Sequence, residues 1–211
     1  MTLSAANDYS GYTFITAGSL ILANPAAIAS SVYDPSGLGG GGFLSFGSLA
    51  AATLGGITGS SGVLSLQNGT GGAVAVSIGA NNASTISAAT LSGVGSLIKV
   101  GTGALTLTGS NAYTGGTTLS AGSLILGADT ALGSLGSLTF SGGTLAYGYT
   151  PVSDFSARFA PLSYGATAFV DQGSYTLTYA SPLTGPGNFT KLGPGSLLLT
   201  GTNTATGVFS V

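Results

Sequence analysis

The chain has 211 residues, a net charge of −2 and only 4% charged residues, against about a quarter in an ordinary globular domain. It contains no His, Cys, Trp or Glu. This excludes Cys/His zinc sites, disulfides, Ser-His-Asp triads and cysteine nucleophiles. Three basic residues are too few for the phosphate contacts of a nucleic-acid-binding protein, and the 44% apolar content excludes disorder. The charged residues are Asp8, Asp34, Lys99, Asp129, Asp154, Arg158, Asp171 and Lys191.

The first segment to interpret is the apolar run from residue 15 to residue 29. It suggests a signal peptide, but no Lys or Arg precedes it, Asp8 lies where a basic residue is needed, and Pro25 interrupts it. Residues 3–22 match residues 107–126 at 11 of 20 positions. We therefore interpret the run as part of an internal repeat. No export signal is visible, and no apolar run is long enough for a transmembrane segment.

Short segments along the whole chain alternate apolar with small polar residues, as in Leu105-Thr106-Leu107. A period of two is typical of a β-strand. Gly and β-branched residues are too frequent for a helix in any window, so we expect well under a tenth of the chain to be helical, on propensity alone. The predicted strands are 19–22, 63–66, 73–78, 104–108, 123–126, 137–140, 174–179 and 196–200.

A second repeat relates residues 91–119 to residues 183–211, which are identical at 13 of 29 positions. Lys99 and Lys191 coincide in this alignment, so they are predicted to occupy one structural position. Lysines at strand edges block unwanted strand pairing. We therefore interpret both as solvated residues at a strand–turn junction rather than as catalytic bases.

Short strands, Gly turns and internal repeats together favour a coil in which each turn of the chain stacks on the previous one. At about 20–25 residues a turn, the chain would make roughly eight to ten turns and form a rod about 40–48 Å long. Asn7, Asn111 and Asn203 lie at predicted turns. We expect them to form stacked amide ladders between turns.

Two segments, 30–48 and 148–166, interrupt the repeat pattern with Pro and aromatic residues. We predict that both are irregular loops protruding from the rod. They are either plain loops or surfaces for lateral contact between rods, since exposed aromatic patches mark interaction sites. The candidate lateral-contact residues are Tyr33, Phe43, Phe46, Phe155, Arg158, Phe159 and Tyr164.

Asp154 and Arg158, followed by Asp171, make the one cluster of charges. A catalytic β-helix needs a positioned acid and base, whereas an Asp and an Arg four residues apart in a loop are more often a surface ion pair. We interpret the pair as structural. Five scattered Asp residues do not predict a calcium site, and the chain predicts no metal and no cofactor.

Residues 101–127, GTGALTLTGSNAYTGGTTLSAGSLILG, closely resemble the passenger-associated β-strand repeat of bacterial autotransporters. The strongest copies are 3–22, 91–127 and 183–207. The resemblance implies an all-β fold, a right-handed parallel β-helix (β-solenoid) exported to the bacterial cell surface, with no common catalytic activity. Such repeats serve as stalk, spacer, adhesive or self-associating surface. We expect residues 1–211 to form a single elongated solenoid, without the membrane barrel that this family uses for export.

Neither end of the chain has a predicted cap, although an open solenoid end exposes unpaired N–H and C=O groups. One interpretation is that neighbouring copies stack head to tail. The alternative is a piece excised from a longer passenger. The candidate end-contact residues are Thr2, Leu3, Tyr9, Val208, Phe209 and Val211.

The sequence thus predicts a non-enzymatic, extracellular structural protein that assembles with itself into a bacterial surface fibre or layer. The alternative is a passenger stalk or adhesin fragment that binds a host cell or a neighbouring cell. A carbohydrate-active β-helix is a third, weaker reading. None of the three needs a nucleic acid or a transmembrane segment.

Overall fold

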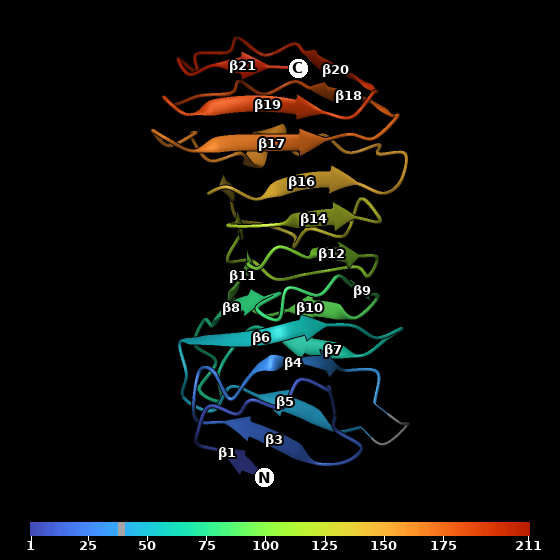
Figure 1. The fold of residues 1–211 in the computed structure, drawn as a ribbon, viewed down its shortest axis with the longest axis vertical. Coiled ribbons are helices and arrows are strands. Elements are labelled where there is room, and N and C mark those ends of the chain that lie inside the picture. The colour runs from blue at the N-terminus through green and yellow to red at the C-terminus, as the bar shows by residue number, and fades with distance from the viewer. Residues whose placement is uncertain (38–40) are drawn as a thin grey trace.

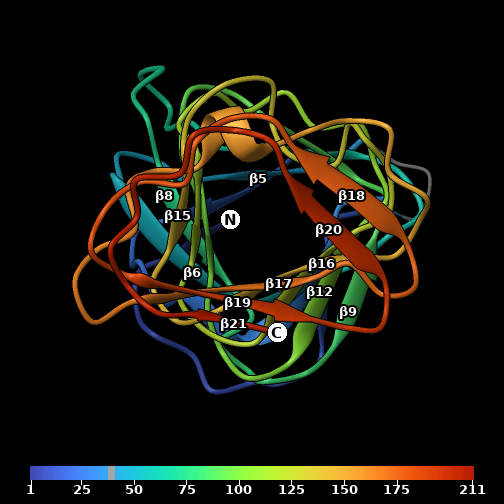
Figure 2. The same ribbon diagram turned by 90° about the horizontal axis from the view of Figure 1, so that it is seen from above.

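The chain coils into a stack of strands that rises from the N-terminus at one end to the C-terminus at the other (Figure 1). This computed structural model describes residues 1–37 and 41–211. Residues 38–40, part of the expected loop 30–48, lie outside the described residues. Seen from above, the strands surround one interior (Figure 2). The arrangement confirms the predicted parallel β-solenoid.

Every pairing between the named strands is parallel, and the strands form two seven-stranded sheets and three smaller ones. The first large sheet contains β2 (Tyr12–Phe14), β4 (Ile28–Asp34), β6 (Ala51–Ile57), β8 (Ala75–Ile78), β11 (Ser96–Lys99), β13 (Thr117–Leu119) and β15 (Leu138–Phe140). The second contains β9 (Thr85–Ser87), β12 (Ala104–Leu107), β14 (Ser123–Leu126), β16 (Thr144–Tyr147), β17 (Thr167–Asp171), β19 (Asn188–Leu192) and β21 (Phe209–Ser210). The smaller sheets contain β1 (Thr2–Leu3), β3 (Ser19–Leu22) and β5 (Phe43–Ser45); β7 (Val63–Ser65) and β10 (Thr90–Ser92); and β18 (Thr176–Tyr179) and β20 (Ser196–Leu199).

The strand register measures the length of each turn of the coil. Paired residues one turn apart are separated by as few as 19 positions, as in Leu105 and Leu124, and by as many as 27, as in Val63 and Thr90. The solenoid has about ten turns. Both the turn length and the number of turns agree closely with the values predicted from the repeats.

The alternating sequence places one set of side chains inside the coil. In β12, Leu105 and Leu107 are buried while Ala104 and Thr106 are partly exposed, and β14 and β16 repeat the pattern. Because the strands are in register, Leu105 stacks on Leu124 of the next turn. Each fully buried leucine contributes about 1.5–3 kcal/mol to folding. The core is therefore a continuous column along the rod.

Glycine is needed where successive turns approach most closely at the corners. A Cβ atom on Gly95 would lie 2.1 Å from the carbonyl oxygens of both Leu66 and Val74. No side chain fits in that space, because both contacts are with backbone atoms that cannot move independently of the sheet.

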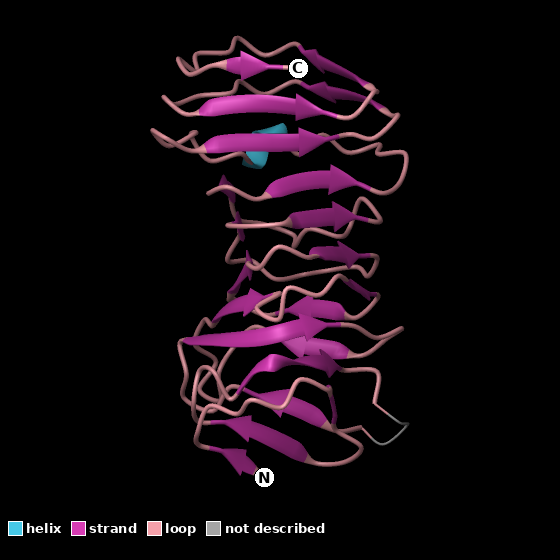
Figure 3. Cartoon of the chain, viewed as in Figure 1, coloured by secondary structure: helices cyan, strands magenta, loops and turns pink. Residues whose placement is uncertain are grey.

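The segments predicted to be protruding loops are more ordered than expected. Strands β4 and β5 lie within residues 30–48 or overlap them, and residues 156–158 of the second segment form the short 3-10 helix η1 (Ser156–Arg158). Figure 3 shows this single helical turn among the strands. In the described part of the chain, no helix is long and apolar enough to span a membrane.

Candidate interaction surfaces

The two ends of the solenoid carry the residues predicted to make end contacts. Strand β1 pairs only with β3, and β21 pairs only with β19, among the described residues. Most of the predicted residues are exposed, whereas Leu3 packs partly against the core. Phe209 is partly covered because its ring stacks on Phe189, with centroids 5.8 Å apart. Head-to-tail contact through these residues remains a prediction.

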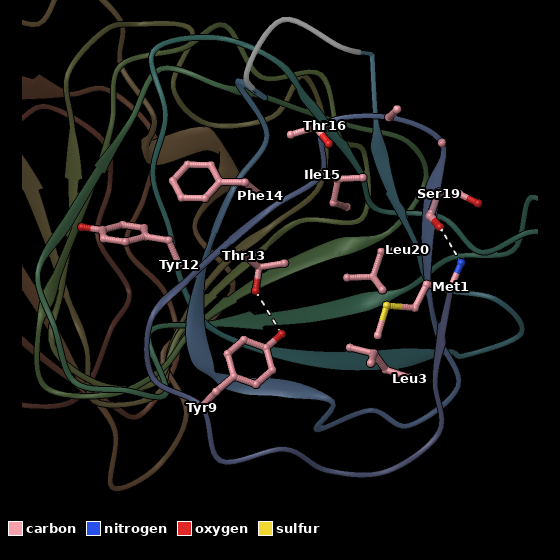
Figure 4. A pocket seen from close by; sticks show the side chains of 12 residues that line it. Met1, Leu3, Tyr9, Tyr12, Thr13, Phe14, Ile15, Thr16, Ser19 and Leu20 are labelled. Atoms are coloured by element: carbon pink, nitrogen blue, oxygen red, sulfur yellow. Dashed lines mark hydrogen bonds between the residues drawn. The ribbon is translucent and has the colours of Figure 1, made fainter.

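A hollow of about 600 Å³ opens at the N-terminal end, and aromatic side chains border it (Figure 4). The Tyr9 hydroxyl lies 3.1 Å from the hydroxyl of Thr13, which in turn lies 2.7 Å from that of Ser31. Tyr12 and Phe14 are exposed, with their rings 5.7 Å apart. The hollow therefore combines apolar rings with hydroxyl groups and holds no charged side chain in its lining.

Most of the aromatic residues predicted for lateral contact are in the core instead. Tyr33, Phe46 and Phe155 are buried, and Phe159 packs edge-to-face on Phe140 with ring centroids 5.2 Å apart. The first three rings are covered by the fold and are not available to a second rod, whereas Phe159 is partly exposed. The physical reason is that packing these rings in or against the core removes apolar surface from water.

Two of the predicted lateral-contact residues are exposed. Phe43 at the start of β5 is 55% exposed, and Tyr164 in the turn before β17 is 90% exposed. Lateral contact through these two side chains remains a prediction.

The predicted ion pair between Asp154 and Arg158 does not form. The Arg158 guanidinium donates to three carbonyl oxygens of the preceding turn, those of Gly133 (2.7 Å), Leu135 (2.8 Å) and Gly136 (3.0 Å). Burial lowers the pKa of Arg158. The Arg158 side chain therefore joins two turns by hydrogen bonds and is not a free surface cation.

The carboxylate of Asp154 also bonds to backbone. Its two oxygens accept the N–H groups of Ser156 at 2.8 Å and of Ala180 at 2.7 Å. The ion pair does not form because both side chains bond to backbone groups instead. The Asp154 carboxylate accepts backbone N–H groups and the Arg158 guanidinium donates to backbone carbonyl oxygens, which satisfies those polar groups.

Asp129, which lies on the preceding turn of the coil, bonds to the segment that leads to Asp154. It accepts hydrogen bonds from the Tyr149 hydroxyl and from the N–H groups of Ser153 (3.0 Å) and Val152 (3.3 Å). Burial alone would raise the pKa of Asp129, but these hydrogen bonds outweigh it and lower the pKa. Asp129 and Asp154 therefore hold residues 149–156 against the rod.

Lys99 contradicts the prediction of a solvated lysine. In β11 the side chains of Leu97 and Lys99 point to the same, inward side of the strand, and only 1% of the Lys99 surface is exposed. Its Nζ donates to the carbonyl oxygens of Val100 (2.6 Å), Gly101 (3.0 Å) and Ala121 (3.2 Å). Burial lowers the pKa of Lys99 to about 8.

Lys191 is partly exposed, in better agreement with the prediction. Its Nζ donates to the carbonyl oxygen of Gly193 at 2.8 Å, two residues along the chain, as Lys99 does to Gly101. The two lysines therefore share a local contact, but the prediction that they occupy one structural position is wrong. Lys99 lies in β11 of the first large sheet and pairs with Ile78, whereas Lys191 lies in β19 of the second and pairs with Val170, because the lengths of the turns between them vary. They differ in burial because Lys99 lies within the stack and Lys191 lies near its end.

The predicted asparagine ladders are also replaced by contacts with the backbone. Asn111 accepts the Leu91 N–H at 2.7 Å and donates to the Ala131 carbonyl at 2.5 Å, so it joins three consecutive turns. Asn203 accepts the Leu183 N–H at 2.8 Å. The three predicted residues lie about a hundred positions apart, so they are never on adjacent turns and cannot stack on one another.

A second hollow, of about 210 Å³, lies beside Pro151, Asp154 and Thr176. It contains one carboxylate, and both oxygens of that carboxylate already accept backbone N–H groups. Within residues 1–37 and 41–211, no three acidic side chains lie close enough together to hold a metal ion. The hollow thus lacks the acid and base pair that glycan cleavage requires.

Comparisons with known proteins agree with the internal repeats. The model of the passenger-associated-transport-repeat family matches residues 1–22, 97–126 and 189–211. A curated relative, an adhesin autotransporter named BmaC from Brucella suis biovar 1 (strain 1330), is 33% identical over 225 aligned positions. The alignment covers 98% of this chain and 6% of that much longer adhesin. No solved structure matches the chain.

The three family matches fall on the strands and corners that the repeat analysis identified, and they lie on a single parallel β-solenoid. Because the alignment with the adhesin runs through nearly the whole chain, the turns between the repeats share the same relationship. The chain therefore belongs to the autotransporter passenger repeat family.

Proposed function

We propose that the chain is a non-enzymatic segment of a surface-displayed passenger that acts as the stalk of an adhesin and contributes to adhesion. The observation that carries the proposal is the continuous alignment of this solenoid with an adhesin autotransporter. A stalk needs an elongated, regular body, and about ten stacked turns with a continuous core supply one. The same relationship supports an extracellular location at the bacterial surface.

The surface chemistry supports a role that does not depend on charge. Asp34, Asp129, Asp154 and Asp171 each accept at least one backbone N–H. The three basic side chains donate to backbone carbonyls. The exterior therefore offers mainly hydroxyl, amide and apolar groups, which suit contacts with a neutral surface better than electrostatic attraction.

The test is to display residues 1–211 on bacteria by fusing them to a signal peptide and an autotransporter barrel. Cells that carry the folded segment are expected to adhere to host cells or to one another more than cells that carry the barrel alone. The control carries Gly95→Val, which is expected to prevent stacking at that corner. Equal adhesion of all three strains, with equal surface levels by antibody labelling, would refute the adhesive role.

A self-assembling fibre is a second candidate, supported by the exposed edges of β1 and β21 and by the low charge. Electron microscopy of purified protein over a range of concentrations tests it. Filaments that disappear in a Phe209→Asp variant would support assembly through the ends. Monodisperse particles at every concentration would reject it.

A further inference from the structure

The tripeptide Asn-x-Ser/Thr, the acceptor pattern for N-linked glycosylation, occurs three times, beginning at Asn68, Asn82 and Asn188. The pattern is short and by itself a weak signal in a chain so rich in Ser and Thr. Its three copies lie in different structural settings, however, and the structure separates them.

The copy at Asn82 lies on an exposed turn between β8 and β9. Asn82, Ala83 and Ser84 are all exposed. Among the described residues Asn82 is the one non-glycine residue with positive φ, at 62°. Asparagine tolerates this left-handed conformation better than most residues.

In the described part of the chain, one of the two polar atoms of the Asn82 side-chain amide makes a hydrogen bond and the other does not. Its Oδ1 accepts the Thr102 N–H of the next turn at 2.9 Å. Its Nδ2 donates to no acceptor in the described part of the chain, whereas Asn68 donates from Nδ2 to Leu49. A sugar attached to Nδ2 leaves the carbonyl oxygen free to keep the bond to Thr102. Modification of Asn82 therefore costs the fold no hydrogen bond.

The other two copies are held in place. Asn68 is partly buried, and its Oδ1 accepts from the N–H groups of Thr70 (3.1 Å) and Gly72 (2.8 Å), so its amide closes a tight loop. Asn188 begins β19, is followed by the buried Phe189, and pairs within the sheet with Thr167. Strand β19 is paired on both sides, with β17 and β21, so an enzyme can reach the tripeptide at Asn188 only after local unfolding, and that at Asn68 only after its loop opens.

We propose that Asn82 is an acceptor site for N-linked glycosylation on the folded rod, and that Asn68 and Asn188 are not. The donor is a nucleoside diphosphate sugar. A bond forms between Nδ2 and the anomeric carbon, the bond between that carbon and the diphosphate oxygen breaks, the nucleoside diphosphate leaves, and Nδ2 loses one proton. The sugar would add hydroxyl groups at an exposed corner of a rod with few free charges.

The test uses folded protein, UDP-glucose and a purified bacterial glycosyltransferase that transfers one hexose to Asn-x-Ser/Thr, with peptide mass spectrometry as the readout. We expect hexose at Asn82, with occupancy at least about tenfold above that at Asn68 or Asn188, because the latter two need local opening. Heat-unfolded protein, treated in parallel, should lose this preference. Ser84→Ala should abolish the modification, Ser84→Thr should keep it, and Thr190→Ala should leave it unchanged.

Circular dichroism of each variant checks that the solenoid is intact. Hexose on Asn68 or Asn188 at a level equal to Asn82 in the folded protein would overturn the proposal. So would an unmodified Asn82 in the folded protein, whether or not the unfolded chain is modified. The outcome does not depend on adhesion, so its failure is distinguishable from failure of the proposed function.

Discussion

The side-chain oxygen of Asn111 accepts the N–H of Leu91, 20 residues earlier in the chain, at 2.7 Å. The same side chain donates to Ala131 on the turn above, so one buried amide joins three turns. We expect Asn111→Ala to leave a buried N–H and a buried C=O unsatisfied and to lower the free energy of unfolding by about 2–4 kcal/mol. Urea denaturation followed by circular dichroism measures this loss.

Asn203→Ala is the matched control, because Asn203 is more exposed and makes one such contact, to Leu183. We expect a loss at least twofold smaller than for Asn111→Ala. Equal losses would mean that burial of the amide adds nothing to its role between turns.

The burial of Lys99 predicts that the free energy of unfolding depends on pH in the alkaline range. Its pKa is about 8 in the folded protein and is ordinarily 10.5, so between these values the unfolded chain binds more protons. Stability should therefore rise with pH over this window, by at most about 3 kcal/mol. Buried tyrosines such as Tyr113 act in the opposite direction near pH 10, because burial raises the pKa of Tyr113.

The difference between the wild type and Lys99→Met, measured by urea denaturation from pH 7 to pH 9.5, isolates the lysine from these tyrosines. The wild type should gain stability relative to the variant as pH rises. If it loses stability instead, the three carbonyl acceptors favour the ammonium form more strongly than burial penalises it.

The hydrogen bonds of Arg158 to backbone carbonyls predict that the free energy of unfolding is insensitive to salt. Its guanidinium bonds to Gly133, Leu135 and Gly136 rather than to an acidic side chain. Arg158→Gln should lower the free energy of unfolding by about 2 kcal/mol. Because backbone carbonyls are not screened as charges are, wild-type stability should change by less than about 0.5 kcal/mol between 0.05 M and 1 M NaCl. A large fall in wild-type stability with salt would argue for a hidden ion pair.

The close packing of the corners predicts that substitutions of two glycines differ sharply in their effect on stability. Gly95→Ala places a Cβ atom 2.1 Å from two carbonyl oxygens and should cost about 3 kcal/mol or more, enough to lower the yield of folded protein. Gly11→Ala is the control, since no atom lies within 4 Å of the added Cβ and the site is exposed. Thermal melting compares the two, and a similar melting temperature for both would contradict the stacked corners.

The sequence was sufficient to predict the fold because one signal repeats on every turn. Alternation such as Leu105-Thr106-Leu107 indicates a strand, and the repeat spacing gives the length of a turn. The burial of Lys99 was not predicted, although the alternation puts it on the same side as Leu97. Lysine is rarely buried, so the expectation for the residue type outweighed the pattern.

The segment at 148–166 was harder to predict because its contacts are not periodic. Phe155 and Phe159 fold onto the core, and Arg158 reaches carbonyls 22 to 25 residues earlier. Pro and aromatic residues indicate a departure from the repeat, but the direction of the departure depends on which backbone groups the turn below leaves unsatisfied. That information is in the three-dimensional arrangement and not in local sequence.

The parallel register of this rod has a mechanical consequence. The backbone hydrogen bonds run between turns, along the long axis, so tension between the two ends loads them in an unzipping geometry, a few at a time. Each turn of about 20 residues that peels away would lengthen the chain by about 70 Å. A stalk built this way would yield to axial tension in steps, extending at modest force instead of transmitting the full load along its length.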